Sequence, residues 1–404
     1  MLINEKTWDF VRQHRADDVR RLALQGAKDG EVELTTALQQ IAGWQTARRK
    51  LPSWAAVEGV VYPPHLNMEQ CSSEQTARYK AQMVSGGCLG GQSFVDLTGG
   101  FGVDFYFMSQ GFGRRVYVEQ DAALCAIAEH NLRLLGLSCS VCCADNATYL
   151  AEMEHAAVIY LDPARRNEHG GRTYGIEDCT PNVLELLPLL QEKADTIVLK
   201  LSPMLDWRKA VDDLGCVSEV HIVSVDNECK ELLLVLGKSA TDGLILTCVN
   251  NDSTFTVVCS VQTLGLLRPN SGFAPSKLPA SADALCFLYE PNASIMKAGC
   301  FEALAERFPV SPVSANSHLF LSSVPIADFP GRGFQITAVS SLNKRDLKTA
   351  LAGVSQANIT VRNFPLTAQQ LRQRLKMKDG GPVYLFATTI ADGSHKLFIC
   401  RKIG

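Results

Sequence analysis

Seven short apolar runs between Ser93 and Gly237 constrain the fold most, because helical segments separate most of them. The runs occupy 93–97, 115–119, 138–143, 156–162, 195–201, 217–225 and 231–237. Strands that alternate with helices predict a doubly wound α/β sheet with a largely parallel core. Only DNECK separates the last two runs, which is too short for a crossover helix. We therefore expect a seven-stranded α/β sheet whose last strand is antiparallel.

The regions that flank these strands have different patterns of apolar residues. Residues 1–85 carry helical periodicity and predict a helical N-terminal cap, and Ser72 with Gln75 forms a capping-box pattern before its last helix. The strand-like run STFTVVCSV opens a further α+β region after about residue 250, with helices expected near 293–306, 344–351 and 368–378. We predict four domains, bounded at 1–85, 86–248, 249–333 and 334–404.

The bulk composition indicates a globular protein of the cytoplasm. The first residues are charged and lack the apolar segment of a secretory signal, and no apolar run approaches the roughly 20 residues that cross a bilayer. The 14 cysteines then indicate reduced, mostly buried thiols. We expect a cytoplasmic protein with no membrane partner.

Charge is unevenly distributed along the chain. The formal net charge is −3, but residues 334–404 carry +8 and the remainder carries −11. A basic terminal module on an acidic body favours a polyanionic partner, although a solvated basic face would look the same.

The loop in SFVDLTGGFGVDFYF follows the first strand and lets a ligand approach the backbone closely. A P-loop would need Lys-Ser/Thr after the last glycine, but Gly102 is followed by Val103 and Asp104. A dinucleotide site would place a pyrophosphate here, and the carboxylate of Asp96 would repel it. The same carboxylate would attract the ammonium group of S-adenosylmethionine. A purely structural turn would explain the glycines but not the acids that follow.

Those acids end successive strands. Glu119 ends the second strand, where it can accept hydrogen bonds from ribose hydroxyls. Asp145 follows the third strand, in position to receive an adenine amino group, and Asp162 with Pro163 ends the fourth. Open α/β sheets place their reacting groups at this carboxyl edge.

These motifs resemble those of the class I S-adenosylmethionine-dependent methyltransferases, with a Rossmann-like sheet. VDLTGGFGVD, YVEQD, CADN and YLDPARR fall where that family has its first, ribose, adenine and catalytic motifs. LNMEQCSSEQTARYKA, SVDNECKELLL and LYEPNASIMKAG further resemble a bacterial group of methyltransferases with a ferredoxin-like domain and a THUMP-like C-terminal domain. That resemblance covers nearly the whole chain. It implies S-adenosylmethionine as cofactor, held by Asp96, Thr98, Gly99, Gly100, Phe101, Gly102, Asp104, Glu119, Gln120, Asp145 and Asn146.

Two further residues are candidates for the cofactor site. Ser73 and Thr76 begin the helix before the glycine loop, where a helix N-terminus could face the carboxylate of the methionine moiety. Ordinary capping of a packing helix explains them equally well.

The acceptor motif departs from that of related amino-methylating enzymes. Those have Asp/Asn-Pro-Pro-Tyr/Phe, with an aromatic ring that stacks on the base, whereas Ala164 and Arg165 follow Asp162 and Pro163 here. We expect Asp162, Pro163 and Arg165 to meet the acceptor, with the arginine stacking on a base or holding a phosphate.

The residues at this edge also resemble those of two other chemistries. The D-P-x-R pattern resembles 5-methyluridine methyltransferases, but Ser202 stands where their cysteine nucleophile would follow the fifth strand. Lys200 with Asp162 is reminiscent of the Lys-Asp-Lys-Glu set of 2'-O-methyltransferases, although a surface or cofactor contact explains one lysine as well. We predict direct transfer, supported by alignment of the reactants, with Lys200 among the catalytic residues.

The basic tail suggests that the acceptor is RNA, either tRNA or rRNA. Related THUMP domains bind RNA, and phosphate contacts from basic side chains give affinity without sequence choice. Rival hypotheses are a small-molecule or protein methyltransferase and a non-catalytic RNA-binding protein. Cys139 and Cys142 lie in one expected strand without a matching second pair, so we expect no metal. The expected RNA-binding residues are Arg362, Arg372, Arg374, Lys376 and Lys378.

Overall fold

The computed structural model describes residues 3–27, 29–85, 92–165, 175–237, 243–260 and 287–403. The chain forms two compact units. Unit 1 comprises Met1–Val220 and Glu231–Thr241, and unit 2 comprises His221–Lys230 and Asp242–Gly404. The four predicted domain boundaries stay a prediction.

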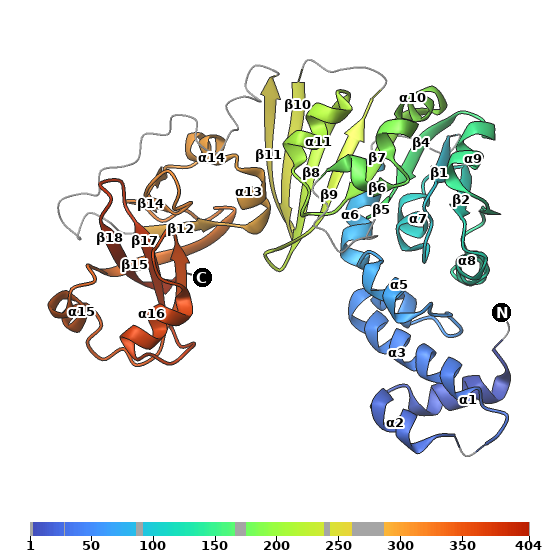
Figure 1. Cartoon of the computed structure of the whole chain (residues 1–404), viewed down its shortest axis with the longest axis horizontal. Helices are drawn as coiled ribbons and strands as arrows, with labels where there is room; N and C mark the ends of the chain where they lie inside the picture. The colour runs from blue at the N-terminus through green and yellow to red at the C-terminus, as the bar shows by residue number, and fades with distance from the viewer. Residues whose placement is uncertain are drawn as a thin grey trace. The chain divides into compact units, whose positions relative to one another are not determined.

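Unit 1 begins with helices, as the periodicity predicts. The side chains of Asn4 and Asp18 accept backbone hydrogen bonds at the starts of the first two helices. Val11, Leu22, Ala37 and Ile41 form the core beneath α1, α2 and α3, which lie together in Figure 1. The six helices are α1 Glu5–His14, α2 Val19–Gln25, α3 Leu34–Lys50, α4 Pro52–Ala55, α5 His65–Gln70 and α6 Glu74–Val84.

The central sheet contains the seven expected strands. They are β1 Ser93–Asp96, β2 Arg114–Glu119, β3 Ser140–Cys143, β4 Ala156–Leu161, β7 Ala194–Leu201, β8 Val217–Val225 and β9 Glu228–Leu236. The sheet order is β11-β10-β8-β9-β7-β4-β1-β2-β3. β4, β1, β2 and β3 pair in parallel, as do β4 and β7, whereas β9 pairs antiparallel with β7. The predicted reversed last strand is confirmed.

The sheet is longer than expected by one hairpin. β10 Gly243–Asn250 pairs antiparallel with β11 Ser253–Ser260, with Asn250 opposite Ser253. Asn251 has a φ of 52°, as tight hairpin turns require at their first central residue. The run STFTVVCSV, expected to open the next region, therefore completes the nine-stranded sheet (Figure 1).

Helices between the strands cover a continuous core. Asp121, Asp145, Asn182 and Asp206 cap α8 to α11 with side-chain oxygens. Phe94, Phe105, Tyr117, Val158 and Val198 belong to the core cluster. The helices are α7 Val103–Met108, α8 Ala122–Leu134, α9 Asn146–Glu152, α10 Val183–Lys193 and α11 Trp207–Leu214, and the one-turn η1 is Ile176–Asp178. A separate ribbon pairs β5 Ala164–Arg165 with β6 Cys179–Thr180.

Unit 2 holds a seven-stranded sheet in the order β13-β14-β12-β15-β18-β17-β16. The strands are β12 Phe287–Pro291, β13 Ser311–Pro312, β14 Phe320–Ser322, β15 Gly331–Ser340, β16 Asn358–Arg362, β17 Val383–Thr389 and β18 His395–Lys402. The helices are α13 Ala293–Ala298, α14 Phe301–Arg307, α15 Lys344–Ala350 and α16 Ala368–Leu375. β12 pairs with β15, so the predicted boundary between 333 and 334 falls within a strand of one shared sheet.

Two predicted helices end differently in the structure. The helix expected over 293–306 is divided into α13 and α14 at Gly299, which has a φ of 69°. The basic helix expected to reach residue 378 ends at Leu375, because Lys376 adopts a left-handed conformation and its N–H closes the last turn. In the described parts of the chain, no helix is long and apolar enough to cross a membrane.

Candidate active site

The glycine loop runs between β1 and α7 and follows the ring of Tyr117 closely. A Cβ atom on Gly99 would lie 2.1 Å from a ring carbon of Tyr117, whose hydroxyl donates to Gly100 O at 2.5 Å. Gly100 and Gly102 have φ values of 52° and 86°. The three glycines are therefore required by the loop itself, either by space or by backbone conformation.

The acids of the next two strands lie beside this loop or at the same sheet edge. Glu119 accepts the Gly100 N–H through Oε2 and the Asp121 N–H through Oε1, each at 2.9 Å. Asp145 caps α9 by accepting the Thr148 N–H at 2.9 Å, and this backbone hydrogen bond lowers its pKa. Glu119 thus fixes the glycine loop, and Asp145 is exposed at the end of β3 next to Asn146.

The Thr98 hydroxyl bridges Asp96 and Asp162. It donates to Asp96 Oδ1 at 3.3 Å and accepts the Asp162 N–H at 2.7 Å, and the Thr98 N–H also donates to Asp96 Oδ1, at 2.9 Å. Asp96 is 1% exposed. Its burial, with the neighbouring carboxylates of Asp104 and Asp162, raises its pKa well above the ordinary value. The structure therefore brings the ends of β1 and β4 together, as the strand-end acids predict.

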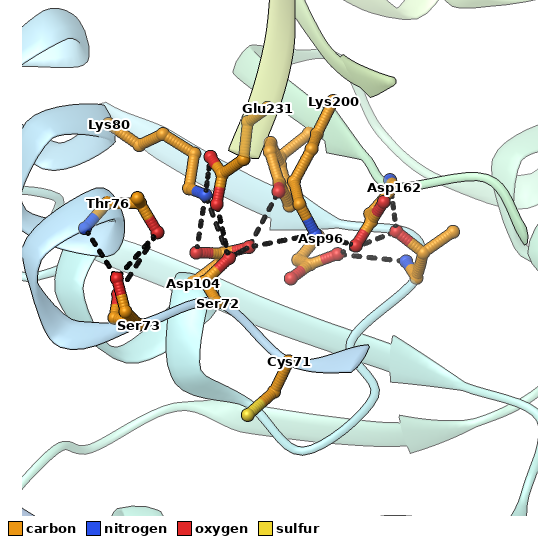
Figure 2. Close-up of polar contacts among 12 residues, drawn as sticks. Cys71, Ser72, Ser73, Thr76, Lys80, Asp96, Asp104, Asp162, Lys200 and Glu231 are labelled. Atoms are coloured by element: carbon orange, nitrogen blue, oxygen red, sulfur yellow. Dashed lines mark hydrogen bonds and ion pairs between the residues drawn. The ribbon is translucent and has the colours of Figure 1, made fainter. Parts of the chain in front are cut away.

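A group of five side chains, which we call the buried polar cluster, lies beneath this edge. Its members are Ser72, Lys80, Asp104 and Glu231, which Figure 2 shows, together with Tyr160. Lys80 Nζ lies 3.0 Å from Asp104 Oδ1, 2.5 Å from Glu231 Oε2 and 2.9 Å from Ser72 Oγ. The Ser72 and Tyr160 hydroxyls each lie 2.8 Å from Asp104 Oδ2. Lys80 is 0% exposed, so its charge is satisfied entirely by these contacts.

The cluster continues to the surface through one ion pair. Lys200 Nζ contacts Asp162 Oδ2 directly and lies 3.9 Å from Asp104 Oδ2. The side chain of Asp162 is 38% exposed and that of Lys200 is 11% exposed. Burial by itself lowers the pKa of Lys200, but Asp162 and Asp104 outweigh it and raise the pKa. Lys200 is therefore a fixed ammonium at the carboxyl edge.

Asp104, Phe101 and Thr76 each make contacts within the protein, and their predicted contacts with the cofactor stay a prediction. Asp104 points into the buried polar cluster and is only 9% exposed. Burial raises its pKa, but Lys80, Lys200 and two hydroxyls outweigh burial, so that the pKa is lowered. Phe101 packs edge-on against Trp54, with ring centroids 5.1 Å apart. Thr76 is 2% exposed and bonds to Ser73 O.

The start of α6 differs from the predicted capping box by one residue. Ser73, not Ser72, is the N-cap, and its Oγ accepts the Thr76 N–H at 3.2 Å. Ser72 points inward because Asp104 and Lys80 offer it buried partners. Ser73 and Thr76 therefore make the contacts of an ordinary helix cap. A role for these two residues in cofactor binding stays a prediction.

The sequence analysis missed Lys80 and Glu231. Glu231 follows the DNECK connection directly, but it lies in β9 and is 4% exposed. Its position at the start of the apolar run ELLLVLG was an available signal, because a carboxylate on a buried strand needs a partner. Lys80 shares the buried side of α6 with Ala77, which was the corresponding signal on the helix.

The remaining acceptor residues lie at the same edge. Pro163 is buried and Ala164 is exposed. Arg165 pairs through its backbone with Cys179, and its side chain lies outside the described part of the structure. The described ranges contain no group of three or more His, Cys, Asp or Glu residues placed to ligate a metal ion.

The five basic residues expected to bind RNA divide into two sets. Arg362 donates to the buried Glu290 Oε1 at 2.9 Å, and Arg372 pairs with Asp379. The other three, Arg374, Lys376 and Lys378, are exposed.

Comparisons with known proteins agree with this architecture. The crystal structure of a proposed methyltransferase from Porphyromonas gingivalis W83 matches with a TM-score of 0.86 and 30% identity, covering 100% of both chains. An uncharacterized S-adenosylmethionine-dependent methyltransferase of Mycobacterium tuberculosis H37Rv is 25% identical over 342 residues, which span 83% of this chain and 87% of the relative. A THUMP domain-like family model matches residues 331–402, and a ferredoxin-like domain model matches residues 287–330.

Proposed function

The chain belongs to the class I S-adenosylmethionine-dependent methyltransferases that carry a THUMP-like C-terminal domain, and on that premise we propose that it methylates RNA, a tRNA or an rRNA. Methyl transfer is direct and uses no cysteine nucleophile. The domain division kept with this proposal is a helical cap at 1–85, a methyltransferase domain at 86–248, a ferredoxin-like domain at 249–333 and a basic THUMP-like domain at 334–404. Its divisions at 248/249 and 333/334 fall within β10 and β15.

The residues around the glycine loop fit S-adenosylmethionine, the cofactor of the family. When ionised, the carboxylates of Asp96, Asp104, Asp162 and Glu231 outnumber the ammonium groups of Lys80 and Lys200 by two. A ligand with a sulfonium and an ammonium against one carboxylate offsets part of that excess. We propose that Asp96, Thr98, Gly99, Gly100, Gly102, Glu119, Gln120, Asp145 and Asn146 hold it. When bound, it supplies an electrophilic methyl group.

The thiols and hydroxyls near the reacting edge favour direct transfer. Ser202 follows β7, where a cysteine-dependent enzyme would need its thiolate. Cys71 precedes Ser72 on the loop before α6 (Figure 2), and its Sγ lies 3.4 Å from Met68 O. Burial raises the pKa of Cys71, which keeps it a neutral thiol and a weak nucleophile. Alignment of acceptor and methyl group supplies the acceleration instead.

The observation that supports RNA as acceptor is the basic character of the THUMP-like module. Residues 334–404 carry +8 against −11 elsewhere. Eight of their basic side chains are exposed, namely Lys344, Arg345, Lys348, Arg374, Lys376, Lys378, Arg401 and Lys402. Such side chains release counterions from a phosphate backbone, so binding should weaken steeply with salt.

The test is methylation of RNA from cells that lack this protein, with the purified full-length chain and methyl-labelled S-adenosylmethionine. The proposal is supported if the macromolecular product contains methyl label that RNase digestion releases and protease digestion does not. Label in protein or in small molecules indicates another acceptor class. Salt-sensitive RNA binding without turnover indicates a non-catalytic binder on a methyltransferase scaffold.

A further inference from the structure

We propose that the acceptor atom is a hydroxyl oxygen, the ribose 2'-hydroxyl of RNA, and that Asp162 and Lys200 are the catalytic pair that handles its proton and its charge. The buried polar cluster holds this pair in position. The inference rests on RNA being the acceptor and adds the atom that is methylated.

Asp162 and Lys200 are placed to meet an acceptor together. They follow paired residues of neighbouring parallel strands, Leu161 of β4 opposite Leu199 of β7. Within the connected set of charged side chains, exposure falls from 38% at Asp162 to 11% at Lys200, 10% at Asp104, 5% at Glu231 and 0% at Lys80. An acceptor at the carboxyl edge therefore meets Asp162 first, with Lys200 directly behind it in contact with Asp162.

The ammonium of Lys200, the cationic member of this pair, discriminates between acceptor atoms. An amine nitrogen gains positive charge as its bond to the methyl carbon forms, and a fixed ammonium nearby opposes that charge. A hydroxyl oxygen sheds its proton as it attacks, and the same ammonium stabilises the developing negative charge. Lys200 stays protonated because Asp162 and Asp104 raise its pKa. The pair thus suits an oxygen nucleophile better than a nitrogen.

The buried polar cluster explains why Lys200 keeps its place. Asp104 Oδ2 lies 3.9 Å from Lys200 Nζ and is itself held by Ser72 and Tyr160 at 2.8 Å. Lys80 balances Asp104 and Glu231 from behind. Lys80 has no exposed surface and is therefore a positioning residue. Its ammonium keeps Asp104 ionised, and Asp104 in turn attracts Lys200.

The transfer step balances with these residues. The hydroxyl oxygen attacks the methyl carbon, an O–C bond forms, and the S–C bond breaks with its electron pair remaining on sulfur. The hydroxyl proton passes to the Asp162 carboxylate and from its exposed side to solvent. Lys200 donates a hydrogen bond to the oxygen and keeps its own protons. A sulfonium and an alcohol thus give a thioether, a methyl ether and one proton.

The residues after Pro163 agree with a sugar acceptor. The amino-methylating motif ends in an aromatic ring that stacks on the target base, and Arg165 replaces that ring in this sequence. A ribose hydroxyl is recognised through its oxygen and needs no ring beneath a base.

The decisive experiment identifies the methylated atom. RNA labelled by the full-length protein is digested to nucleosides for mass spectrometry, and a second portion is hydrolysed with alkali, which cannot cleave beside a 2'-O-methyl ribose. Methyl groups on ribose, in alkali-resistant dinucleotides, are expected. Methyl groups on bases overturn the hydroxyl assignment and leave the RNA methyltransferase in place. Unlabelled RNA overturns both proposals.

Asp162→Asn separates the two acceptor chemistries within one enzyme. An amide can accept a hydrogen bond from an amine but cannot take up a hydroxyl proton, so kcat should fall by about 10²–10⁴. The kcat of Lys200→Met should fall by a similar factor. Binding of S-adenosylmethionine, measured by calorimetry, should be retained and shows that the variant is folded. Lys209→Met, at a surface ion pair with Asp213, is the matched control. Asp162→Asn activity within tenfold of the parent would refute the role in proton uptake.

Discussion

Lys80→Met tests whether the buried polar cluster holds the helical cap and the sheet together. Lys80 comes from α6, and its two carboxylate partners come from α7 and β9. Methionine retains most of the apolar stem and removes only the ammonium. The variant leaves Asp104 and Glu231 buried, with Lys200 as the remaining cation 3.9 Å from Asp104.

The magnitude follows from those distances. A pair at about 3 Å is worth roughly 5 kcal/mol at an effective dielectric constant of about 20, before the cost of desolvating the charges. Breaking a buried pair by removing one partner costs about 3–5 kcal/mol, because the other charge stays buried. We expect the free energy of unfolding of unit 1 to fall by that amount.

Tryptophan fluorescence during urea denaturation measures this change in unit 1 alone. All four tryptophans, Trp8, Trp44, Trp54 and Trp207, belong to that unit. The double variant Lys80→Met/Glu231→Gln should recover part of the loss, because it removes one of the uncompensated carboxylates. A loss below about 1 kcal/mol in Lys80→Met would refute the reasoning, as would a double variant less stable than the single one.

The pH dependence gives an independent check of the same reasoning. The pKa of Asp104 is lowered in the fold, so its contribution to stability is present above the unfolded value of about 4 and is lost as pH falls through the folded value. In Lys80→Met that contribution shrinks. The stability difference between parent and variant should therefore be largest at neutral pH and should narrow toward pH 4.

Three further predictions concern cofactor and RNA. Gly99→Ala should weaken S-adenosylmethionine binding and destabilise the fold by about 1–3 kcal/mol, because the added methyl group would overlap the Tyr117 ring. Calorimetry measures the binding and urea denaturation measures the stability. Gly30→Ala, where the added Cβ meets open space, is the control and should change neither. Binding of the cationic cofactor should release protons from Asp96 and strengthen as pH rises, because burial raises the pKa of that carboxyl. Titrations in buffers of different ionisation enthalpy test this, and a buffer-independent heat would contradict it. Lys376→Ala/Lys378→Ala should reduce the slope of log affinity for RNA against log salt by roughly 2, whatever the RNA sequence, and an unchanged slope would exclude phosphate contacts at these residues.

Much of the fold and of the cofactor edge could be predicted from sequence because the signals are local. Each strand of the central sheet is an apolar run of a few residues, and the short DNECK connection alone requires the reversed last strand. The glycine loop and the strand-end acids Asp96, Glu119 and Asp162 follow from position within those runs. Their common sheet edge then follows from the parallel pairing.

Only the tertiary structure could reveal the buried polar cluster. Lys80 and Glu231 are separated by 151 residues, and although each lies on the apolar side of its own segment, nothing in either segment names the other as its partner. The placement of Ser72 rather than Ser73 inside the protein and the pairing of β11 with the central sheet were equally beyond sequence patterns. The physical reason is that periodicity encodes which side of an element is apolar, whereas a buried charge is stable only when the complete fold supplies its partners.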